Sequence, residues 1–362
     1  MADDIEWVTD RARFAALEQA WDALAEDDPM PFGVHRWFAA WLAGFGEGAR
    51  LRVCLLWRDG TLAGAFPLWH RGRRLEAMAS TLHTPVFRPL ARDAAARDRL
   101  LEEAVAAAGG GELSVESVVE GDSLLPALAR AARGRRRLVL IEPQHTSPIV
   151  ETTGEFEAYR RAMKRGWREL ERRRRKMHRE HDVRYSLLEA PDDLDAALER
   201  GFAVESSGWK GAAGTAITSS PETLTFYREV ARAYHRAGQL SLSELWLDGA
   251  LVAFDLSVLH ERRLYLLKTG YDESIRTLAP GLALRRAVIE RCFERKLDAL
   301  ELLGDDMPWK RLFATSERRH VRFGSYGTRP VPLARYAERR TMPAVRRLYV
   351  RHVKPRLGRG GA

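Results

Sequence analysis

A strand-to-helix junction in the C-terminal part of the chain has the residue types of an anion site. The pattern predicts a strand at 262–272, a loop at 274–278, and a helix at 279–296 that opens with Pro280 and Gly281. Proline suits a first helical turn because its missing N–H would be unpaired there, and glycine lets a ligand approach the backbone. The amides of the first turn would then point at a pyrophosphate, with the positive end of the helix dipole. The alternative is an ordinary structural cap.

The sequence has no pattern typical of a catalytic nucleophile or of a metal site. The chain has no G-x-S-x-G segment, and its two cysteines, Cys54 and Cys292, lie in apolar stretches without a nearby histidine. Neither has the spacing of a zinc site, a redox pair or a disulfide framework, so a reducing cytoplasm fits best. His178 and His181 lie three residues apart in a run of arginines, and we expect them to face solvent. We therefore predict no metal and no tightly bound cofactor.

The positive charge is concentrated in two segments. The chain has a net charge of +9, and residues 160–179 alone hold eleven Lys and Arg against two Glu. Residues 335–362 hold nine Lys and Arg against one Glu. Such segments favour an anionic partner: a phosphorylated cofactor, an RNA such as tRNA, or an anionic membrane surface. A solvated helix face and a loose tail explain the charge equally well.

Length and composition limit the class of protein. A chain of 362 residues suggests about two domains. Apolar residues at 45% and charged residues at 30% exclude a disordered or fibrous chain. No apolar run is long enough to cross a bilayer, and the start MADDIEW lacks the apolar stretch of a signal peptide. We therefore expect a cytoplasmic protein that could still contact a membrane through its basic tail.

An internal repeat organises the chain. A shift of 189 residues superposes 51–75 on 240–264 without a gap, with nine of 25 positions identical. Each copy predicts a strand, an Asp-Gly hairpin turn, a second strand, and a charged turn into a third. A helix precedes each hairpin, and a second helix and a strand follow it, at about 97–108 and 112–119 and at about 280–296 and 298–303. This order predicts a mixed α/β (α+β) fold with two similar domains.

The regions between and around the copies lead to three further predictions. Residues 155–181 are predicted to form one long helix, anchored by Trp167 and Leu170. The segment IEPQHTSPIV at 141–150 holds two prolines and is the expected domain boundary. We therefore divide the chain into 1–150, 151–330 and a basic C-terminal helix or tail at 331–362.

Several motifs in the second copy resemble one family. They are ESSGWKGAAGTAI from Glu205, the run GQLSLSELWLDGALVAFDLSVLHERRLYLLKTGYDE, the APG at 279–281, and ELLGDDMPWKRLF at 301–313. Together they are similar to the CelD-like acyltransferases of the GNAT superfamily, which are related in architecture to the FemAB aminoacyl transferases. The resemblance covers roughly 14–330 and is densest at 205–313.

The resemblance implies a fold, a donor and a donor loop. It implies two tandem GNAT-like domains, each a mixed, mainly antiparallel sheet flanked by helices, with acyl-CoA as co-substrate at a strand junction. The superfamily loop R/Q-x-x-G-x-G/A matches Arg276 to Gly281, except that Ala279 replaces the first glycine. The expected donor-binding residues are Arg276, Ala279, Gly281, Leu282 and Ala283. The long helical arm of the FemAB enzymes has no obvious counterpart.

The implied reaction is transfer of an acyl group from a thioester to an amine, which must first lose a proton. Glu205 and Asp255 are candidate bases, and Tyr271 is a candidate acid for the departing thiolate. Each also has a structural alternative: an ion pair with Lys210, a solvent-facing strand edge, and a tyrosine at the core edge. The remaining candidates would bind substrate, with Asp305 and Asp306 also able to cap a helix: Trp209, Lys210, Lys268, Asp272, Asp305 and Lys310.

The leading hypothesis is an N-acyltransferase that uses acyl-CoA, in polysaccharide, envelope or natural-product biosynthesis, with its site in the second copy. One alternative is an aminoacyl-tRNA-dependent transferase, favoured by the basic helix and by the alanine at 279. Another is a non-catalytic binding or scaffold protein of an envelope polysaccharide machine. A sugar amine, an amino acid, a lipid amine and a peptide side chain all remain possible acceptors, and acyl length is open.

Overall fold

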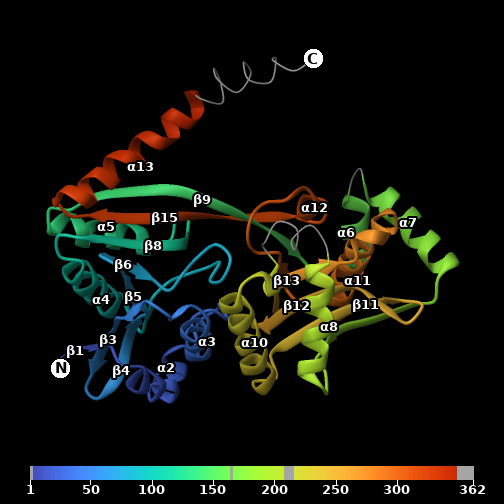
Figure 1. Cartoon of the computed structure of the whole chain (residues 1–362), viewed down its shortest axis with the longest axis horizontal. Helices are drawn as coiled ribbons and strands as arrows, with labels where there is room; N and C mark the ends of the chain where they lie inside the picture. The colour runs from blue at the N-terminus through green and yellow to red at the C-terminus, as the bar shows by residue number, and fades with distance from the viewer. Residues whose placement is uncertain (1–2, 164–165, 208–215, 349–362) are drawn as a thin grey trace.

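The computed structural model describes residues 3–163, 166–207 and 216–348. It has an elongated body, with an N-terminal half and a C-terminal half side by side and helix α13 (Pro330–Leu348) rising from one end (Figure 1). Among the described helices, none is long and apolar enough to cross a membrane.

A single large sheet runs through both halves. Its strand order is β10-β11-β12-β13-β14-β9-β15-β8-β6-β5-β2. In this order the strands span Val183–Glu189, Leu240–Leu247, Ala250–His260, Arg263–Tyr271, Ala299–Glu301, Leu138–Glu151, Ser316–Tyr326, Glu112–Val119, Arg74–Ala77, Leu68–Arg71 and Arg50–Leu51.

A smaller sheet and the helices complete the two halves. The small sheet has the order β1-β3-β4-β7, with strands Asp3–Val8, Val53–Arg58, Thr61–Phe66 and Leu90–Ala91. The N-terminal helices are α1 (Arg11–Ala15), α2 (Glu18–Leu24), α3 (His35–Phe45), α4 (Ala94–Ala107) and α5 (Leu124–Gly134). The C-terminal helices are α6 (Phe156–Ala162), α7 (Trp167–Glu180), α8 (Leu194–Ser206), η1 (Ile217–Ser219), α10 (Pro221–Arg236), η2 (Glu273–Leu278), α11 (Pro280–Glu294) and α12 (Pro308–Arg311).

The predicted repeat is confirmed in the strand pairing. Both Asp-Gly turns have positive φ at both residues, as a two-residue hairpin requires. The register shifts in the two hairpins fall at Leu56 and at Leu245, which are 189 residues apart. The parallel pairs that follow begin at Arg74 and at Arg263, again 189 residues apart. The fold is thus two tandem GNAT-like α/β units that share the large sheet only in part, because the hairpin of the first copy, β3 with β4, lies in the small sheet.

The segment expected to be a boundary linker is instead the middle of a strand. Residues 141–150 lie in β9, which pairs with β15 from Leu138 and reaches β14 only at Ile149. Pro143 and Pro148 fall where β9 has a strand partner on one side only, which is where a sheet tolerates proline. The predicted limit at 150/151 falls at the end of this strand, and the division into domains stays a prediction.

Two local predictions are also corrected. The long helix expected over 155–181 is two helices, because α6 ends at Ala162 and Met163 is extended, with ψ 128°. The loop expected over 274–278 is the short helix η2. Trp167 and Leu170 are buried as predicted, and so is Met177 of the same helix.

The hydrophobic core consists of two clusters, and their border does not coincide with the border between the two halves. One large apolar cluster fills the N-terminal half and extends to α8, α10 and Tyr265 of β13. A second cluster lies in the C-terminal half, between α7, α11 and the sheet. Helices α3 and α10 are in close contact, with Trp37 against Phe226 at a ring distance of 5.3 Å. The two units are therefore packed into one molecule by buried aromatic side chains.

Candidate active site

Strands β13 and β14 separate soon after they meet. They pair in parallel at three positions, the last being Tyr265 with Glu301. Strand β13 then continues to Tyr271 with only β12 as a described partner. Glu301 is fully buried between Arg263 (2.7 Å) and Arg318 (2.9 Å), and these ion pairs fix the point of separation. The arrangement leaves the β14-facing edge of β13 beyond Tyr265 without a strand neighbour among the described residues.

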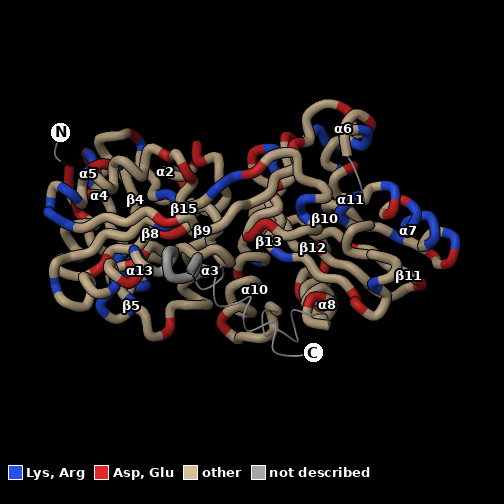
Figure 2. Tube along the Cα trace, turned by 90° about the horizontal axis from the view of Figure 1, so that it is seen from above, with Lys and Arg blue, Asp and Glu red and all other residues tan. Residues whose placement is uncertain are grey.

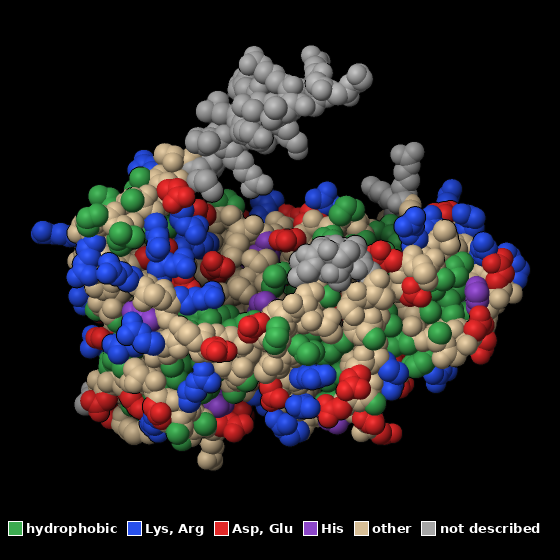
Figure 3. All heavy atoms as spheres, viewed as in Figure 1, with side chains coloured by type: hydrophobic (Ala, Val, Ile, Leu, Met, Phe, Trp, Pro, Cys, Tyr) green, Lys and Arg blue, Asp and Glu red, His purple; other side chains and the backbone are tan. Residues whose placement is uncertain are grey.

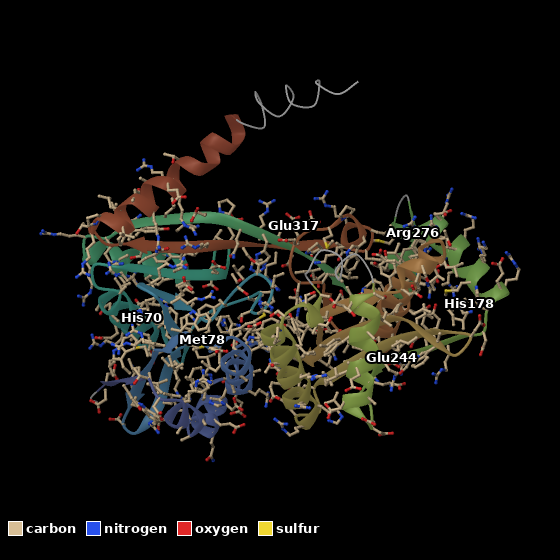
Figure 4. All side chains as sticks on the ribbon, in the orientation of Figure 1. His70, Met78, His178, Glu244, Arg276 and Glu317 are labelled. Carbon is tan, nitrogen blue, oxygen red and sulfur yellow. The ribbon has the colours of Figure 1, made fainter. Side chains whose placement is uncertain are left out.

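The start of α11 lies just past the end of β13. Ala279 has the left-handed conformation (φ 54°, ψ 51°) and directs the chain from η2 into the helix, whose first residue is Pro280. A non-glycine residue at positive φ is strained, and such strain concentrates at ligand sites. Ala279 thus takes the conformation that a glycine would adopt most easily at this loop position. Arg276 is exposed on the preceding turn (Figure 4).

Gly281 and Tyr271 are in contact. A Cβ atom built on Gly281 would lie 3.0 Å from the Tyr271 ring, so the ring closes the space above this glycine. Burial raises the pKa of Tyr271, with a smaller contribution from Glu273. The phenol is therefore protonated at neutral pH and able to donate a proton. Leu282 and Ala283 complete the first turn, with Ala283 buried.

Glu205 lies on the opposite face of the sheet from α11, at the end of α8. The side chain is buried, and its Oε2 accepts a hydrogen bond from the Ile217 amide at 2.8 Å. Helix α8 approaches β13 closely here, because a Cβ on Gly270 would lie 2.4 Å from the Glu205 Cα. Burial raises the pKa of Tyr227 on α10, and the negative charge of Glu205 raises it further. Glu205 is therefore a buried carboxylate packed against β13 at Gly270.

Lys268 connects this face to the N-terminal half. Its Nζ lies 4.7 Å from the centre of the Tyr227 ring, and the Tyr227 hydroxyl donates to the Leu82 carbonyl at 3.0 Å. Burial, and then the charge of Lys268, lower the pKa of His83 to about 3. His83 and Tyr227 were not among the predicted site residues, because only the packing of α10 against the loop 79–87 brings them to Lys268.

Asp255 is not at a solvent-facing strand edge, as one alternative held. It is buried on β12, and its Oδ1 accepts a hydrogen bond from Nη2 of the buried Arg285 at 2.6 Å. Arg285 belongs to α11, and Thr269 of β13 lies opposite Asp255. The ion pair thus joins α11 to β12 beneath the first turns of the helix.

The remaining substrate-side candidates make local contacts. The Asp272 carboxylate accepts from the Ser274 amide at 2.9 Å and caps η2. The buried Lys310 ammonium donates to the carbonyls of Leu303 and Asp305. Asp305 is exposed. The prediction that Asp305 or Asp306 caps α12 is wrong. The N-cap residue is Met307, and Asp306 instead pairs with Arg311.

The candidates therefore fall into groups. The structure brings Tyr271 to Gly281 on the α11 side, and Glu205 and Lys268 to Tyr227 on the α10 side. Asp255 lies beneath α11, and Asp305 and Lys310 lie on the loop that follows β14. Trp209 and Lys210 lie outside the described residues. Histidine side chains are visible in the middle of the molecule, between the two halves (Figure 3).

The basic helix α7 lies beside the donor loop. It contacts η2 and α11, and its Glu171 binds Arg286 of α11 at 2.9 Å. Arg172 and Arg179 are largely exposed, with 66% and 70% of their side chains accessible. Figure 2 shows Lys and Arg along α7 at the end of the molecule. Helix α7 therefore carries exposed arginines on an element that contacts η2 and α11.

Residues 162–311 match the model of the acetyltransferase (GNAT) domain. This segment contains the hairpin of the second copy, the separated strands and α11. No curated protein matches the chain significantly. By its GNAT domain, the protein is an acyltransferase.

Solved structures share the fold over nearly the whole chain. One is the C-terminal domain of a protein described as a lysylphosphatidylglycerol synthetase from Agrobacterium fabrum, with 13% identity, 89% of this chain and 94% of that chain covered, and a TM-score of 0.58. FemX has 12% identity, 92% and 100% coverage, and a TM-score of 0.58. L-PGS from Bacillus licheniformis has 12% identity, 90% and 95% coverage, and a TM-score of 0.54.

Proposed function

We propose that the protein is a CelD-like N-acyltransferase that transfers an acyl group from acyl-CoA to an amine. The observation that carries the proposal is the combination of two features within the GNAT domain. Strands β13 and β14 separate after three paired residues, and α11 begins beside the gap with Ala279, Pro280 and Gly281. The amides of the first turn of α11 would bind the pyrophosphate of CoA, and the pantetheine arm would extend along the open edge of β13.

The chemistry follows from the groups around the gap. The acceptor ammonium first loses a proton, and its nitrogen then attacks the thioester carbonyl carbon. The nitrogen of the tetrahedral intermediate then releases its second proton, and the carbon–sulfur bond breaks to give an amide and a thiolate, which takes up a proton in turn. Backbone amides at the open edge of β13 would stabilise the oxyanion. No covalent acyl-enzyme is needed, in agreement with the buried positions of both cysteines.

Two residues are assigned to the proton transfers. Tyr271, protonated and in contact with Gly281, would donate to the thiolate. Glu205 would accept the proton of the ammonium, because it is a buried carboxylate close to the edge of β13. Lys268 and Tyr227 would line the acceptor side, where the loop 79–87 of the first copy contributes to the site.

A second candidate is an aminoacyl-tRNA-dependent transferase. The observation in its favour is the exposed arginine face of α7, which adjoins the donor loop. FemX, a protein with a similar fold, is consistent with this candidate. Phosphate contacts make RNA binding strongly salt-dependent, whereas a CoA pyrophosphate held by first-turn amides depends on salt much less.

Calorimetric titration of the full chain with acetyl-CoA and with a long-chain acyl-CoA tests the proposal. We expect micromolar binding that Gly281→Trp abolishes. The matched control is Gly134→Trp, because Gly134 has open space around its Cβ position. If neither acetyl-CoA nor the long-chain acyl-CoA binds, the proposal is contradicted. Salt-sensitive binding of aminoacyl-tRNA would then support the second candidate.

A further inference from the structure

The two strands that flank β15 in the large sheet, β9 and β8, each carry an extra residue, at positions two residues apart along β15. Between the pairs of Val321 with Pro143 and Arg319 with Thr146, β9 has one residue more than β15. Strand β8 likewise has an extra residue opposite Arg322, where Ser117 has a φ of 59°. Bulges re-aim side chains and are frequent next to active sites. Both bulges flank His320 of β15, in the middle of the strands that run through both halves.

The bulges bury three polar residues near one another, which we call the bulge cluster: Ser117, His145 and His320. Their exposed fractions are 0%, 7% and 1%. The two imidazole rings stack at 4.2 Å with an interplanar angle of 7°, and Nδ1 of His320 lies 3.4 Å from the Ser117 carbonyl oxygen.

Polar atoms of the bulge cluster lack hydrogen-bond partners. Within the described part of the chain, this holds for both ring nitrogens of His145, for Nε2 of His320 and for Oγ of Ser117. The Pro85 carbonyl is near His145 but not at hydrogen-bonding geometry. Unpaired buried polar groups destabilise a fold, so a group of them points to a ligand or to water that completes the bonds.

The bulge cluster is uncharged at neutral pH. Burial, with a smaller effect of the neighbouring His145, lowers the pKa of His320 to about 3, and burial lowers that of His145. Each neutral ring offers one donor and one acceptor nitrogen. The cations close by are engaged: Lys310 donates to backbone carbonyls, and Arg322 binds Glu112 (2.7 Å) and Glu142 (2.9 Å). A carboxylate or phosphate would therefore find no uncommitted counter-charge among these groups.

The bulge cluster adjoins the candidate active site. Ser147, two residues after His145 on β9, donates to the Gly304 carbonyl at 3.1 Å, in the loop that also holds Asp305. Gln144 accepts from the Ser117 amide at 2.8 Å and donates to Thr81 at 3.0 Å, in the loop 79–87. Gln144 is half-buried, so it links the Ser117 backbone of the bulge cluster to the loop 79–87 near the surface.

We propose that the bulge cluster is the acceptor subsite and holds hydroxyl groups of the acceptor amine. A hydroxyl group both donates and accepts a hydrogen bond, which matches neutral imidazoles and a serine hydroxyl. The acceptor class is therefore an amine carried on a hydroxyl-rich, uncharged frame, as in an amino sugar. This inference rests on the proposed function, because it assigns the second substrate of that reaction.

The test is a calorimetric titration of the full chain with D-glucosamine, with cyclohexylamine as the ring amine that lacks hydroxyl groups. We expect D-glucosamine to bind at least about tenfold more tightly than cyclohexylamine, and His145→Leu or His320→Leu to weaken it by about tenfold. His145→Gln keeps a donor and an acceptor and should retain binding. His178→Leu is the control, since His178 is exposed on α7, far from the bulge cluster (Figure 4).

Equal binding of the two amines, or leucine variants that are folded and bind like the wild type, would overturn the subsite and leave a cluster that holds only water. If the leucine variants do not fold, the ring ¹⁵N resonances of the wild type decide. Shifts of His145 and His320 on adding D-glucosamine support the subsite, and unchanged resonances overturn it. D-glucosamine binding without acetyl-CoA binding would keep the subsite and contradict the proposed function instead.

Discussion

Close packing, one left-handed residue and a buried ion pair hold the residues around the start of α11 in place. Gly281 leaves room for the Tyr271 ring, Ala279 holds a left-handed turn, and Asp255 pairs with Arg285 under α11. Of these features, the sequence revealed only the Pro-Gly start and a carboxylate in an apolar strand. It could not identify the partner of Asp255, because Arg285 looks like one of many helical arginines until α11 is placed on β12.

The contact between Gly281 and Tyr271 leads to a prediction. Gly281→Ala adds a Cβ atom 3.0 Å from the Tyr271 ring, so the ring must move from the first turn of α11. We expect acetyl-CoA to bind about tenfold more weakly. Adding Tyr271→Ala removes the clash, so the double variant should recover affinity even though Tyr271→Ala alone slows turnover. If Gly281→Ala alone binds acetyl-CoA as tightly as the wild type, the contact between Gly281 and Tyr271 does not matter for binding and the prediction is wrong.

His83 leads to a prediction about acid stability. Its pKa is about 3 in the folded chain and about 6.5 when unfolded. Between these values the unfolded chain binds the extra proton, so the free energy of unfolding falls as pH falls below about 6.5. As the pH falls through this range, the free energy of unfolding of the wild type should decrease by up to about 1.4 kcal/mol per pH unit more than that of His83→Gln. Urea unfolding at pH 7, 6 and 5 measures the difference; parallel curves would contradict it.

At the scale of elements, the repeat was predictable and the connections were not. The hairpins, α4 with β8, and α11 with β14 follow from Asp-Gly turns and apolar periodicity. The break after Ala162 was missed because arginines continue across it, and β9 was missed because its two prolines are typical of a linker. Proline is tolerated there because the adjacent side of β9 has no described strand partner before Ile149.

The packing of α8 on β13 can be tested at Gly270. A Cβ atom at this position would lie 2.4 Å from the Cα of Glu205, so neither backbone can relax without separating helix and strand. We expect Gly270→Ala to destabilise the chain by about 1–3 kcal/mol and to reduce activity by displacing Glu205. Chemical denaturation measures the first effect. Gly134→Ala, in helix α5 at a site with open space, should not destabilise the chain and should leave activity unchanged.

The molecule as a whole is organised around two shared strands. Strand β15 lies between β9 and β8, and β9 in turn reaches β14 of the other copy. Residues that are 175 positions apart, His145 and His320, thereby stack at the centre. No local pattern in the sequence could indicate this pairing, which explains why the bulge cluster was absent from the predicted site while much of the donor loop was present.

Strand sharing predicts that the halves depend on one another. A fragment of residues 1–150 would lack β15, leaving β8 and β9 without the strand that separates them. We therefore expect this fragment to aggregate or to give the narrow amide dispersion of an unfolded chain, whereas the chain of residues 1–341 folds. A well-dispersed spectrum from the fragment alone would contradict the shared-strand account and favour two independent domains.

In the proposed function the donor binds at the start of α11, in the second copy alone. Hydrogen–deuterium exchange of the full chain with and without CoA tests it most directly, because first-turn amides that hold a pyrophosphate exchange more slowly. We predict slower exchange in peptides covering 279–284 and no change at 94–97, the start of α4 in the first copy. Unchanged exchange at 279–284, or protection confined to α4, would contradict the claim.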